Sequence, residues 1–149
     1  LHHQRNQLQH QCHSLNEKRD STGNTFIKWK YKTENCSWAK WGINWNNWNQ
    51  INFRGITSKS ILEFKLKTDS DIEFYVSFED FKGNSSSKLI SIKETSDFSQ
   101  WKAIKIPLKE FNFEEKKFVL DQIKQLTFRG GKSGKVLLDD IKIVSNEVY

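Results

Sequence analysis

The 149-residue chain contains no methionine, a single proline and only seven glycines. So little proline and glycine excludes collagen-like and low-complexity linker sequences, which need far more of both. The sequence also lacks any run of about 18 apolar residues, the length at which a transmembrane helix becomes feasible, so we expect no membrane insertion. A chain of this length is expected to form one domain around one core.

Apolar residues make up only 36% of the sequence, but aromatic residues account for 13%. Eleven phenylalanines and six tryptophans therefore predict a core of few, large side chains. The formal charge is +6, from 24 basic and 18 acidic residues. Because lysine occurs in every segment, we interpret this charge as a solubilising surface. An anionic partner, either an acidic polysaccharide or a nucleic acid, is the alternative.

Residues 1–24 differ in composition from everything after them. They hold all four histidines, many Gln and Asn residues and almost no apolar side chains. Such a segment cannot bury enough surface to offset the entropy lost on ordering. We therefore expect a disordered or linker-like leader over 1–24 and a folded domain over 25–149.

The two cysteines, Cys12 and Cys36, show no spacing typical of a zinc or redox site, but a disulfide between them is compatible with the sequence. Asn35 and Asn84 each begin an Asn-X-Ser glycosylation pattern. Both features are typical of secreted proteins, so we expect an extracellular or cell-surface location.

From Phe26 onward the apolar residues recur with a period of two, which predicts β-strands. Inward-facing candidates lie in 61–67 (Leu62, Phe64, Leu66), 71–79 (Ile72, Phe74, Val76, Phe78), 88–93 (Ile90, Ile92), 101–107 (Ile104, Ile106) and 123–129 (Ile123, Leu126, Phe128), with a further strand over 136–144. Between 101–107 and 123–129, residues 108–122 predict a long loop or a short helical turn. Many short strands without a long helix predict an all-β fold, an antiparallel β-sandwich (jelly roll).

Three links between these strands contain turn residues. Thr68-Asp69-Ser70 predicts a hairpin between the strands over 61–67 and 71–79. Lys82-Gly83-Asn84-Ser85 predicts the turn into 88–93, and the glycines of 130–134 predict a hairpin between the last two strands.

The tryptophans are concentrated between residues 37 and 55, where four of the six occur. They are Trp38, Trp41, Trp45 and Trp48. Their spacing is helical, but the Gly and Asn residues between them are poor helix formers, so we favour a loop followed by a strand. We expect Trp38 and Trp101 to pack in the core.

The sequence offers no catalytic constellation, and we expect a binding module rather than an enzyme. All histidines lie in the leader, neither cysteine has a base partner, and no nucleophile elbow or phosphate-binding loop is present. Glu73 and Glu79 share one strand, but six residues at ~3.3 Å each place them about 20 Å apart, too far for a glycosidase pair.

Three motifs resemble the carbohydrate-binding-module type of jelly-roll domain, which has the galactose-binding-like fold. They are Trp38-Ala39-Lys40-Trp41-Gly42-Ile43-Asn44-Trp45, Trp101-Lys102-Ala103-Ile104-Lys105-Ile106-Pro107-Leu108 and Val136-Leu137-Leu138-Asp139-Asp140-Ile141-Lys142-Ile143. The resemblance covers about residues 26–146. It implies non-catalytic, lectin-like binding of a polysaccharide or oligosaccharide by a monomer.

Two other functions stay open beside this resemblance. Domains similar to the complex I assembly factor family share the layout, so a protein-interaction or assembly domain is the main alternative. Single-stranded nucleic-acid binding, suggested by basic charge and aromatic residues, is a third function that we do not favour.

Alternation predicts which polar side chains would meet a sugar. Residues 51–55 and 126–130 both read apolar-polar-apolar-arginine-glycine, so their polar members should face outward. With the tryptophans, the expected carbohydrate-binding set is Trp41, Trp45, Trp48, Asn52, Arg54, Glu73, Tyr75, Gln125, Thr127 and Arg129. Tryptophan would bury the C–H faces of sugar rings, and the polar groups would bond the hydroxyls. The alternatives are packing roles for the tryptophans and pairing of the arginines with Glu73 or Glu79.

The resemblance also raises the question of a structural calcium, for which Asp139 and Asp140 are the candidate ligands. The segment Tyr31-Lys32-Thr33-Glu34 lacks the acidic pair usual near the start of calcium-binding members. Calcium needs six or more oxygens, and only Glu34 adds to the two aspartates. The alternative is that both aspartates bond amides of a turn; no other cofactor is expected.

Overall fold

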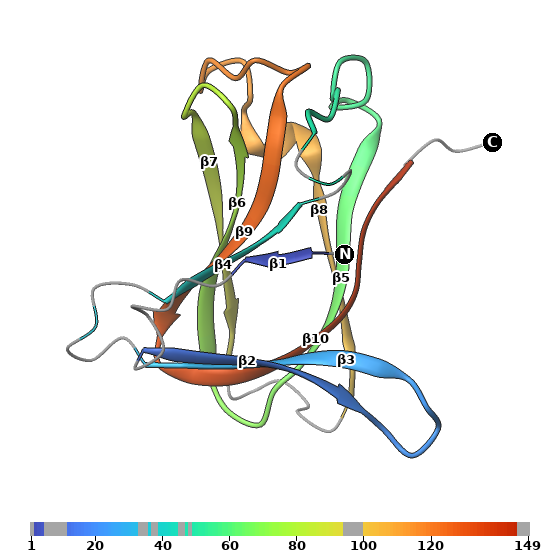
Figure 1. Ribbon diagram of the computed structural model, residues 1–149, viewed down its shortest axis with the longest axis vertical. Helices are drawn as coiled ribbons and strands as arrows, with labels where there is room; N and C mark the ends of the chain where they lie inside the picture. Colours follow the sequence, from blue (N-terminus) through green and yellow to red (C-terminus); the bar gives the residue numbers. More distant parts are fainter. Residues whose placement is uncertain are drawn as a thin grey trace.

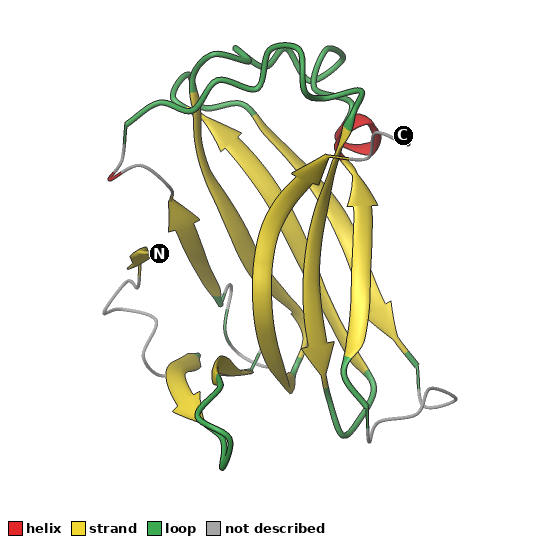
Figure 2. Cartoon of the chain, turned by 90° about the vertical axis from the view of Figure 1, so that its right-hand side faces the viewer, coloured by secondary structure: helices red, strands yellow, loops and turns green. Residues whose placement is uncertain are grey.

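Two five-stranded antiparallel sheets form a sandwich in the computed structural model, which describes residues 2–4, 12–32, 36, 39–44, 47, 49–93 and 100–145. Sheet A has the strand order β1-β4-β9-β6-β7, and sheet B has the order β2-β3-β10-β5-β8. Figure 1 labels the strands of both layers, and Figure 2 shows loops gathered at the ends of the sandwich. The predicted all-β sandwich is confirmed.

The strands are β1 (His2–Gln4), β2 (His13–Arg19), β3 (Thr25–Tyr31), β4 (Lys40–Asn44), β5 (Ser60–Lys67), β6 (Ile72–Asp80), β7 (Ser85–Ile92), β8 (Lys102–Pro107), β9 (Ile123–Lys132) and β10 (Gly134–Ser145). A short 3-10 helix, η3 (Leu108–Phe111), follows β8 in the region predicted to be irregular.

Aromatic side chains from both sheets form the core. Trp29 of β3 is fully buried, and its ring lies 5.9 Å from Trp41 of β4 and 5.8 Å from Phe74 of β6. Trp41 in turn stacks on Phe128 of β9, with 4.5 Å between ring centroids. Such pairs add about 0.5–1.5 kcal/mol each beyond the area they bury. The few large side chains expected from the composition therefore do form the core.

Two hairpins, β2–β3 and β6–β7, are closed by the same turn sequence, Asp-X-X-Gly-Asn. In the second, the Asp80 carboxylate accepts 2.9 Å hydrogen bonds from the backbone N–H groups of Lys82 and Asn84. Gly83 has φ +89°, a left-handed conformation that glycine adopts without strain. Asp20 holds the first turn by matching bonds. The turn predicted between β6 and β7 is confirmed.

Asp80 is the buried member of the two turn aspartates, at 2% exposure. It also accepts hydrogen bonds from the Asn84 side chain and, at 2.8 Å, from the Val119 N–H, which ties the hairpin to a distant loop. Burial by itself raises the pKa of the Asp80 carboxyl. The hydrogen bonds outweigh burial and hold the pKa below its usual value.

The hairpins predicted at 68–70 and at 130–134 are wrong. β5 pairs with β10 and β8 in sheet B, whereas β6 pairs with β9 and β7 in sheet A, so the chain crosses between the sheets after β5. It crosses again between β9 and β10. The glycines of the second link allow close packing: a Cβ on Gly130 would lie 2.5 Å from the Tyr31 ring.

Part of the segment expected to be a disordered leader is built into sheet B. β2 pairs in register with β3 along its whole length. His13 is buried, and its Nδ1 accepts a 3.3 Å hydrogen bond from Trp29 Nε1. A Cys12–Cys36 disulfide joins the start of β2 to the segment after β3. The boundary expected at residue 24 therefore does not separate an unstructured segment from the fold.

Candidate functional site

The outer face of sheet A carries side chains in rows that run across the strands. These residues alternate with buried, inward-facing neighbours such as Trp41, Phe74 and Phe128, so they point away from the core. The first row is Lys40, Arg129, Tyr75 and Leu89; the second is Gly42, Thr127, Ser77 and Ser87; the third is Gln125, Glu79 and Ser85. With neighbouring strands about 4.8 Å apart, the first row spans roughly 14 Å.

Arg129 lies in the middle of the first row, with its guanidinium carbon 4.3 Å from the centroid of the Tyr75 ring. This cation–π contact holds the planar guanidinium in place. Within the described part of the chain Arg129 forms no ion pair, so its N–H donors stay available at the surface. The alternative pairing with Glu73 or Glu79 is not formed. Glu73 Oε2 instead lies 3.9 Å from the Lys132 amine.

An ion pair crosses the second row. Lys40 Nζ lies 2.7 Å from Glu79 Oε1, which links β4 to β6 across the intervening strand β9. Gln125 donates a hydrogen bond to the other carboxylate oxygen of Glu79. Gly42 makes room for this network, because a Cβ there would lie 2.6 Å from Gln125 Oε1. Thr127 lies on β9 below the link and is only 2% exposed.

Glu73 stands beside Tyr75 on β6, and its backbone is fixed from inside the sandwich. The Tyr31 hydroxyl donates a 2.7 Å hydrogen bond to the Glu73 carbonyl. Burial raises the pKa of Tyr31 well above its usual value, which keeps the phenol protonated as a donor. A Cβ on Gly131 would lie 2.8 Å from the same carbonyl oxygen, so glycine allows the two strands to approach.

The expected sugar-stacking tryptophans do not lie on this face within the described residues. Trp41 is 1% exposed and belongs to the core, because the alternation along β4 turns Lys40 and Gly42 outward instead. This corrects the expectation that Trp41 contacts a ligand. Trp45 and Trp48 lie outside the described residues.

Asn52 and Arg54 also lie apart from the rows. Residues 51–55, expected to form a strand, make a single β-bridge at Ile51 and then a turn in which Asn52 Oδ1 accepts a 2.8 Å hydrogen bond from the Arg54 N–H. Arg54 Nε lies 3.7 Å from Asp121 Oδ2. Both residues therefore belong to the loops that close the sandwich.

The structure thus brings together half of the expected set and adds neighbours that the sequence did not identify. On one face lie Glu73, Tyr75, Gln125, Thr127 and Arg129, with Gln125 and Thr127 largely covered. The additions are Lys40, Glu79 and Leu89. Alternation predicts that Lys40 and Glu79 face outward, but only the strand order shows that they flank Tyr75 and Arg129.

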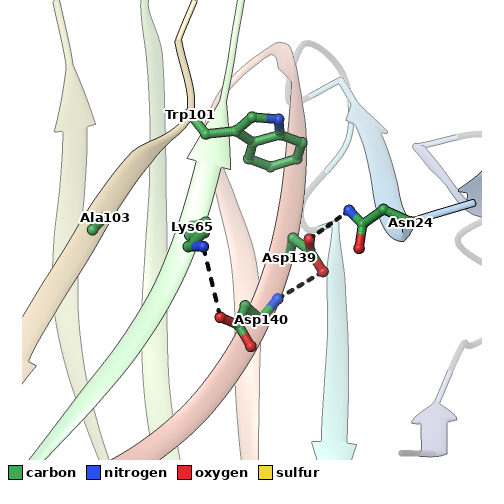
Figure 3. A pocket seen from close by; sticks show the side chains of 6 residues that line it. All are labelled: Asn24, Lys65, Trp101, Ala103, Asp139 and Asp140. Atoms are coloured by element: carbon green, nitrogen blue, oxygen red, sulfur yellow. Dashed lines mark hydrogen bonds and ion pairs between the residues drawn. The ribbon is translucent and has the colours of Figure 1, made fainter. Parts of the chain in front are cut away.

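Asp139 and Asp140 lie on β10 of sheet B and not in sheet A. Figure 3 shows them beside Asn24 and Lys65. Asp139 accepts hydrogen bonds from the Asn24 side chain at 3.0 Å and from the Asp140 N–H at 2.8 Å. Asp140 Oδ2 lies 3.1 Å from the Lys142 amine. No group of three or more His, Cys, Asp or Glu side chains in the described ranges is arranged to hold a metal. These contacts use the two aspartates to bind an amide, a backbone N–H and a lysine amine, which is the alternative to a calcium site. Glu34, the third candidate ligand, lies outside the described residues.

Solved structures of carbohydrate-binding modules share this fold. A family 30 module matches with a TM-score of 0.75 at 17% identity, over 93% of this chain and 76% of its own. The family 30 module of the cellulosomal cellulase Cel9D-Cel44B of Clostridium thermocellum matches with a TM-score of 0.70 at 18% identity, over 91% and 84%. A family 11 module from Clostridium thermocellum, solved in complex with a β-1,3-1,4-mixed-linked tetrasaccharide, has a TM-score of 0.60 at 17% identity, over 89% and 82%. The fold is that of a carbohydrate-binding module.

The family itself follows from the sequence match. The family model described as carbohydrate binding domain 30 matches residues 4–145. The chain belongs to this family and is a non-catalytic carbohydrate-binding domain. No curated protein matches it. Among the described residues, no helix has the length and apolar character needed to cross a membrane.

Proposed function

We propose that the outer face of sheet A binds a polysaccharide, with Arg129 and Tyr75 at the centre of the site. The contact between these two side chains is the observation that carries the proposal. It holds the guanidinium N–H donors at the surface without a carboxylate partner in the described residues. A sugar presents hydroxyl oxygens as acceptors, and a fixed planar donor group binds them with defined geometry.

Apolar contact would come from the β6–β7 half of the face. Leu89 is 49% exposed and lies in register beside Tyr75. Next to them, the Ser77 and Ser87 hydroxyls bond one another, and such small side chains leave room for a sugar ring to reach Tyr75 and Leu89. The C–H face of a pyranose ring would be buried there without loss of a polar partner.

The charges on this face favour a neutral polysaccharide over an acidic one. Lys40 is neutralised by Glu79, and Glu73 lies near Lys132. Among the described side chains of the three rows, Arg129 is therefore the one cation without a carboxylate partner. A family 11 module of similar fold was solved with a β-1,3-1,4-mixed-linked tetrasaccharide, which makes mixed-linked β-glucan the first ligand to test. The Trp45 and Trp48 stacking hypothesis stands as part of this proposal.

We also infer an extracellular or cell-surface location, supported by the Cys12–Cys36 disulfide. Such bonds persist in oxidising compartments and are rare in the cytosol. A protein-interaction role for the same face is the alternative function. It predicts capture of a partner that free sugars do not displace.

The test is affinity electrophoresis of the domain in gels containing mixed-linked β-glucan, other glucans, mannan or polygalacturonate. We expect retardation by a neutral polysaccharide that persists at 0.5 M salt (~4 Å Debye length), because the contacts are hydrogen bonds and apolar surface. Absence of retardation by every member of the panel would refute the proposal. If only polygalacturonate retards the domain, and if added salt abolishes this retardation, the proposal that the ligand is neutral would be refuted.

A further inference from the structure

Trp101 lies on the outer face of sheet B, opposite the site proposed above. Its side chain is 37% exposed, which corrects the expectation that it packs in the core. On β8, Ile106 faces inward and Ile104 packs against the core. Trp101 is three positions before Ile104. Because side chains alternate between the two faces of a strand, this odd spacing places Trp101 on the outer face. The Trp101 ring meets Phe26 of β3 edge to face, with 5.8 Å between centroids. This contact holds the indole across the sheet.

The indole borders a hollow of about 590 Å³ in this outer face (Figure 3). The other lining residues are Asn24, Lys65, Ala103, Asp139 and Asp140. They come from β5, β8, β10 and the β2–β3 turn, so the hollow is built by four separate parts of the fold. Its volume falls within the roughly 300–1,000 Å³ of small-molecule sites.

Polar groups in the hollow are held in place by the surrounding fold. The Asn24 amide donates to Asp139 at 3.0 Å, which orients both groups. The register of β10 shifts between Asp139 and Lys142, and Asp140 within this bulge has φ +55°. Bulges redirect side chains, and here the Asp140 carboxylate lies 3.9 Å from Lys65 and 3.1 Å from Lys142.

We propose that this hollow is a second carbohydrate site, which takes a neutral sugar unit of a polysaccharide. The Trp101 indole covers the C–H face of the ring, while Asn24 and Asp139 bond its hydroxyls. The Asp140 carboxylate is balanced by lysine amines, so the hollow has no excess of positive charge with which to attract an acidic sugar. The proposal rests on the carbohydrate-binding function of the family, but not on the site assigned to sheet A.

Two sites on opposite faces give the domain a property that one site lacks. A single domain can then bind two polysaccharide chains at once, or two segments of one flexible chain. Linked sites raise retention on a polymer far above that of either site alone, because the second contact becomes intramolecular. A short oligosaccharide cannot span both faces. A titration with it therefore counts the sites without the gain in retention that linked sites have on a polymer.

The experiment counts binding sites by calorimetric titration with the β-1,3-1,4-mixed-linked tetrasaccharide and with neutral oligosaccharides of other linkages. We expect two sites in the unchanged domain and one in Trp101→Ala. Ala103→Phe, which fills the hollow but keeps the indole, should also have one. Phe81→Ala removes another exposed aromatic side chain, outside both sites, and should keep two. Thermal unfolding of each variant establishes that it is folded.

The outcomes separate this inference from the function proposed for sheet A. One site in the unchanged domain, lost in Arg129→Ala and kept in both Trp101→Ala and Ala103→Phe, would overturn the second site alone. One site lost in Trp101→Ala and kept in Arg129→Ala would support the hollow and overturn the assignment to sheet A. Two sites that persist in both Trp101→Ala and Ala103→Phe would place the second ligand elsewhere and overturn this proposal.

Discussion

Lys40 of β4 and Glu79 of β6 form an ion pair that reaches across β9, with 2.7 Å between Nζ and Oε1. Their side chains are 34% and 20% exposed, so the pair is itself part of the surface. Thr127 lies below it and is almost fully buried. A ligand on sheet A would therefore meet Lys40, Glu79 and Arg129, but not the Thr127 side chain.

Because Thr127 lies below the ion pair, substituting it tests how deeply a ligand enters the proposed face. We expect Thr127→Val, which keeps the shape and removes the hydroxyl, to change the sugar affinity by less than about twofold, or ~0.4 kcal/mol. Calorimetric titration with the sugar identified in the gel panel measures the effect. A loss of affinity of about tenfold or more would mean that the ion pair opens and that the ligand reaches the Thr127 hydroxyl.

The two Asp-X-X-Gly-Asn turns predict a difference in stability between equivalent substitutions. Asp80→Ala removes a buried carboxylate that accepts hydrogen bonds from several backbone N–H groups, and we expect it to lower the free energy of unfolding by about 2–3 kcal/mol. Asp20→Ala is the matched control, since its turn is exposed and water can replace the lost bonds; its effect should be clearly smaller. Urea denaturation of both variants checks this. Equal losses would show that the burial of Asp80 and its bonds to Val119 and to the Asn84 side chain add no stability beyond that of an exposed turn.

Asp80 also predicts the acid response of the fold. Its pKa is lower in the folded state than in the unfolded chain, so its contribution is fully present above the unfolded value, about 3.9. The contribution is lost as the pH falls through the lower, folded pKa. We expect the unfolding free energy to decline below about pH 4, and to decline less steeply in Asp80→Asn. Parallel curves for the two proteins would contradict this role.

Glycine at position 130 predicts a steric effect on the core. Gly130→Ala would place a Cβ 2.5 Å from the fully packed Tyr31 ring, and we expect overpacking to cost about 1–3 kcal/mol. Gly42→Ala places a Cβ at a similar distance, 2.6 Å, from the amide tip of Gln125, which can rotate away. The same substitution should therefore cost less at position 42. Thermal unfolding of both variants measures the two costs. A larger loss of stability in Gly42→Ala than in Gly130→Ala would contradict this explanation.

The Cys12–Cys36 bond predicts that the β2 segment depends on oxidation. Closing a loop with a sequence separation of 24 restricts the unfolded chain, and we expect Cys12→Ser with Cys36→Ser to lower the unfolding free energy by about 3 kcal/mol. Denaturation of the variant and of the reduced domain should agree. If neither differs from the oxidised domain, the bond does not stabilise the fold.

Much of the strand content was predictable, because alternation is local. Phe74, Val76 and Phe78 on β6 are buried as expected, and so are Leu62 and Phe64 on β5. Strand pairing was less predictable. Turn residues such as Thr68-Asp69-Ser70 fit a hairpin and a crossing between sheets equally well, since both need the chain to bend. Only the packing of two apolar sheet faces decides between them.

At the candidate site, too, the direction of each side chain was predictable from its neighbours in sequence, whereas contacts between strands were not. The outward direction of Tyr75 and Arg129 followed from the period of two, but their contact required β6 and β9 to be neighbours. Trp101 was expected in the core as part of the strand that carries Ile104, but its odd spacing from Ile104 turns it outward. β2 was missed because the inward residues of its buried end include a histidine. The Trp29 side chain that donates a hydrogen bond to His13 lies 16 residues further along the chain.

The most direct test of the central claim is the affinity of Arg129→Ala for the polysaccharide that retards the unchanged domain. Removal of the guanidinium should weaken binding about tenfold or more, as for the loss of charge-assisted hydrogen bonds worth roughly 1.5–3 kcal/mol. Arg19→Ala, which removes an exposed arginine from sheet B, is the matched control and should bind like the unchanged domain. Equal affinity of a folded Arg129→Ala domain and the unchanged one would contradict the account.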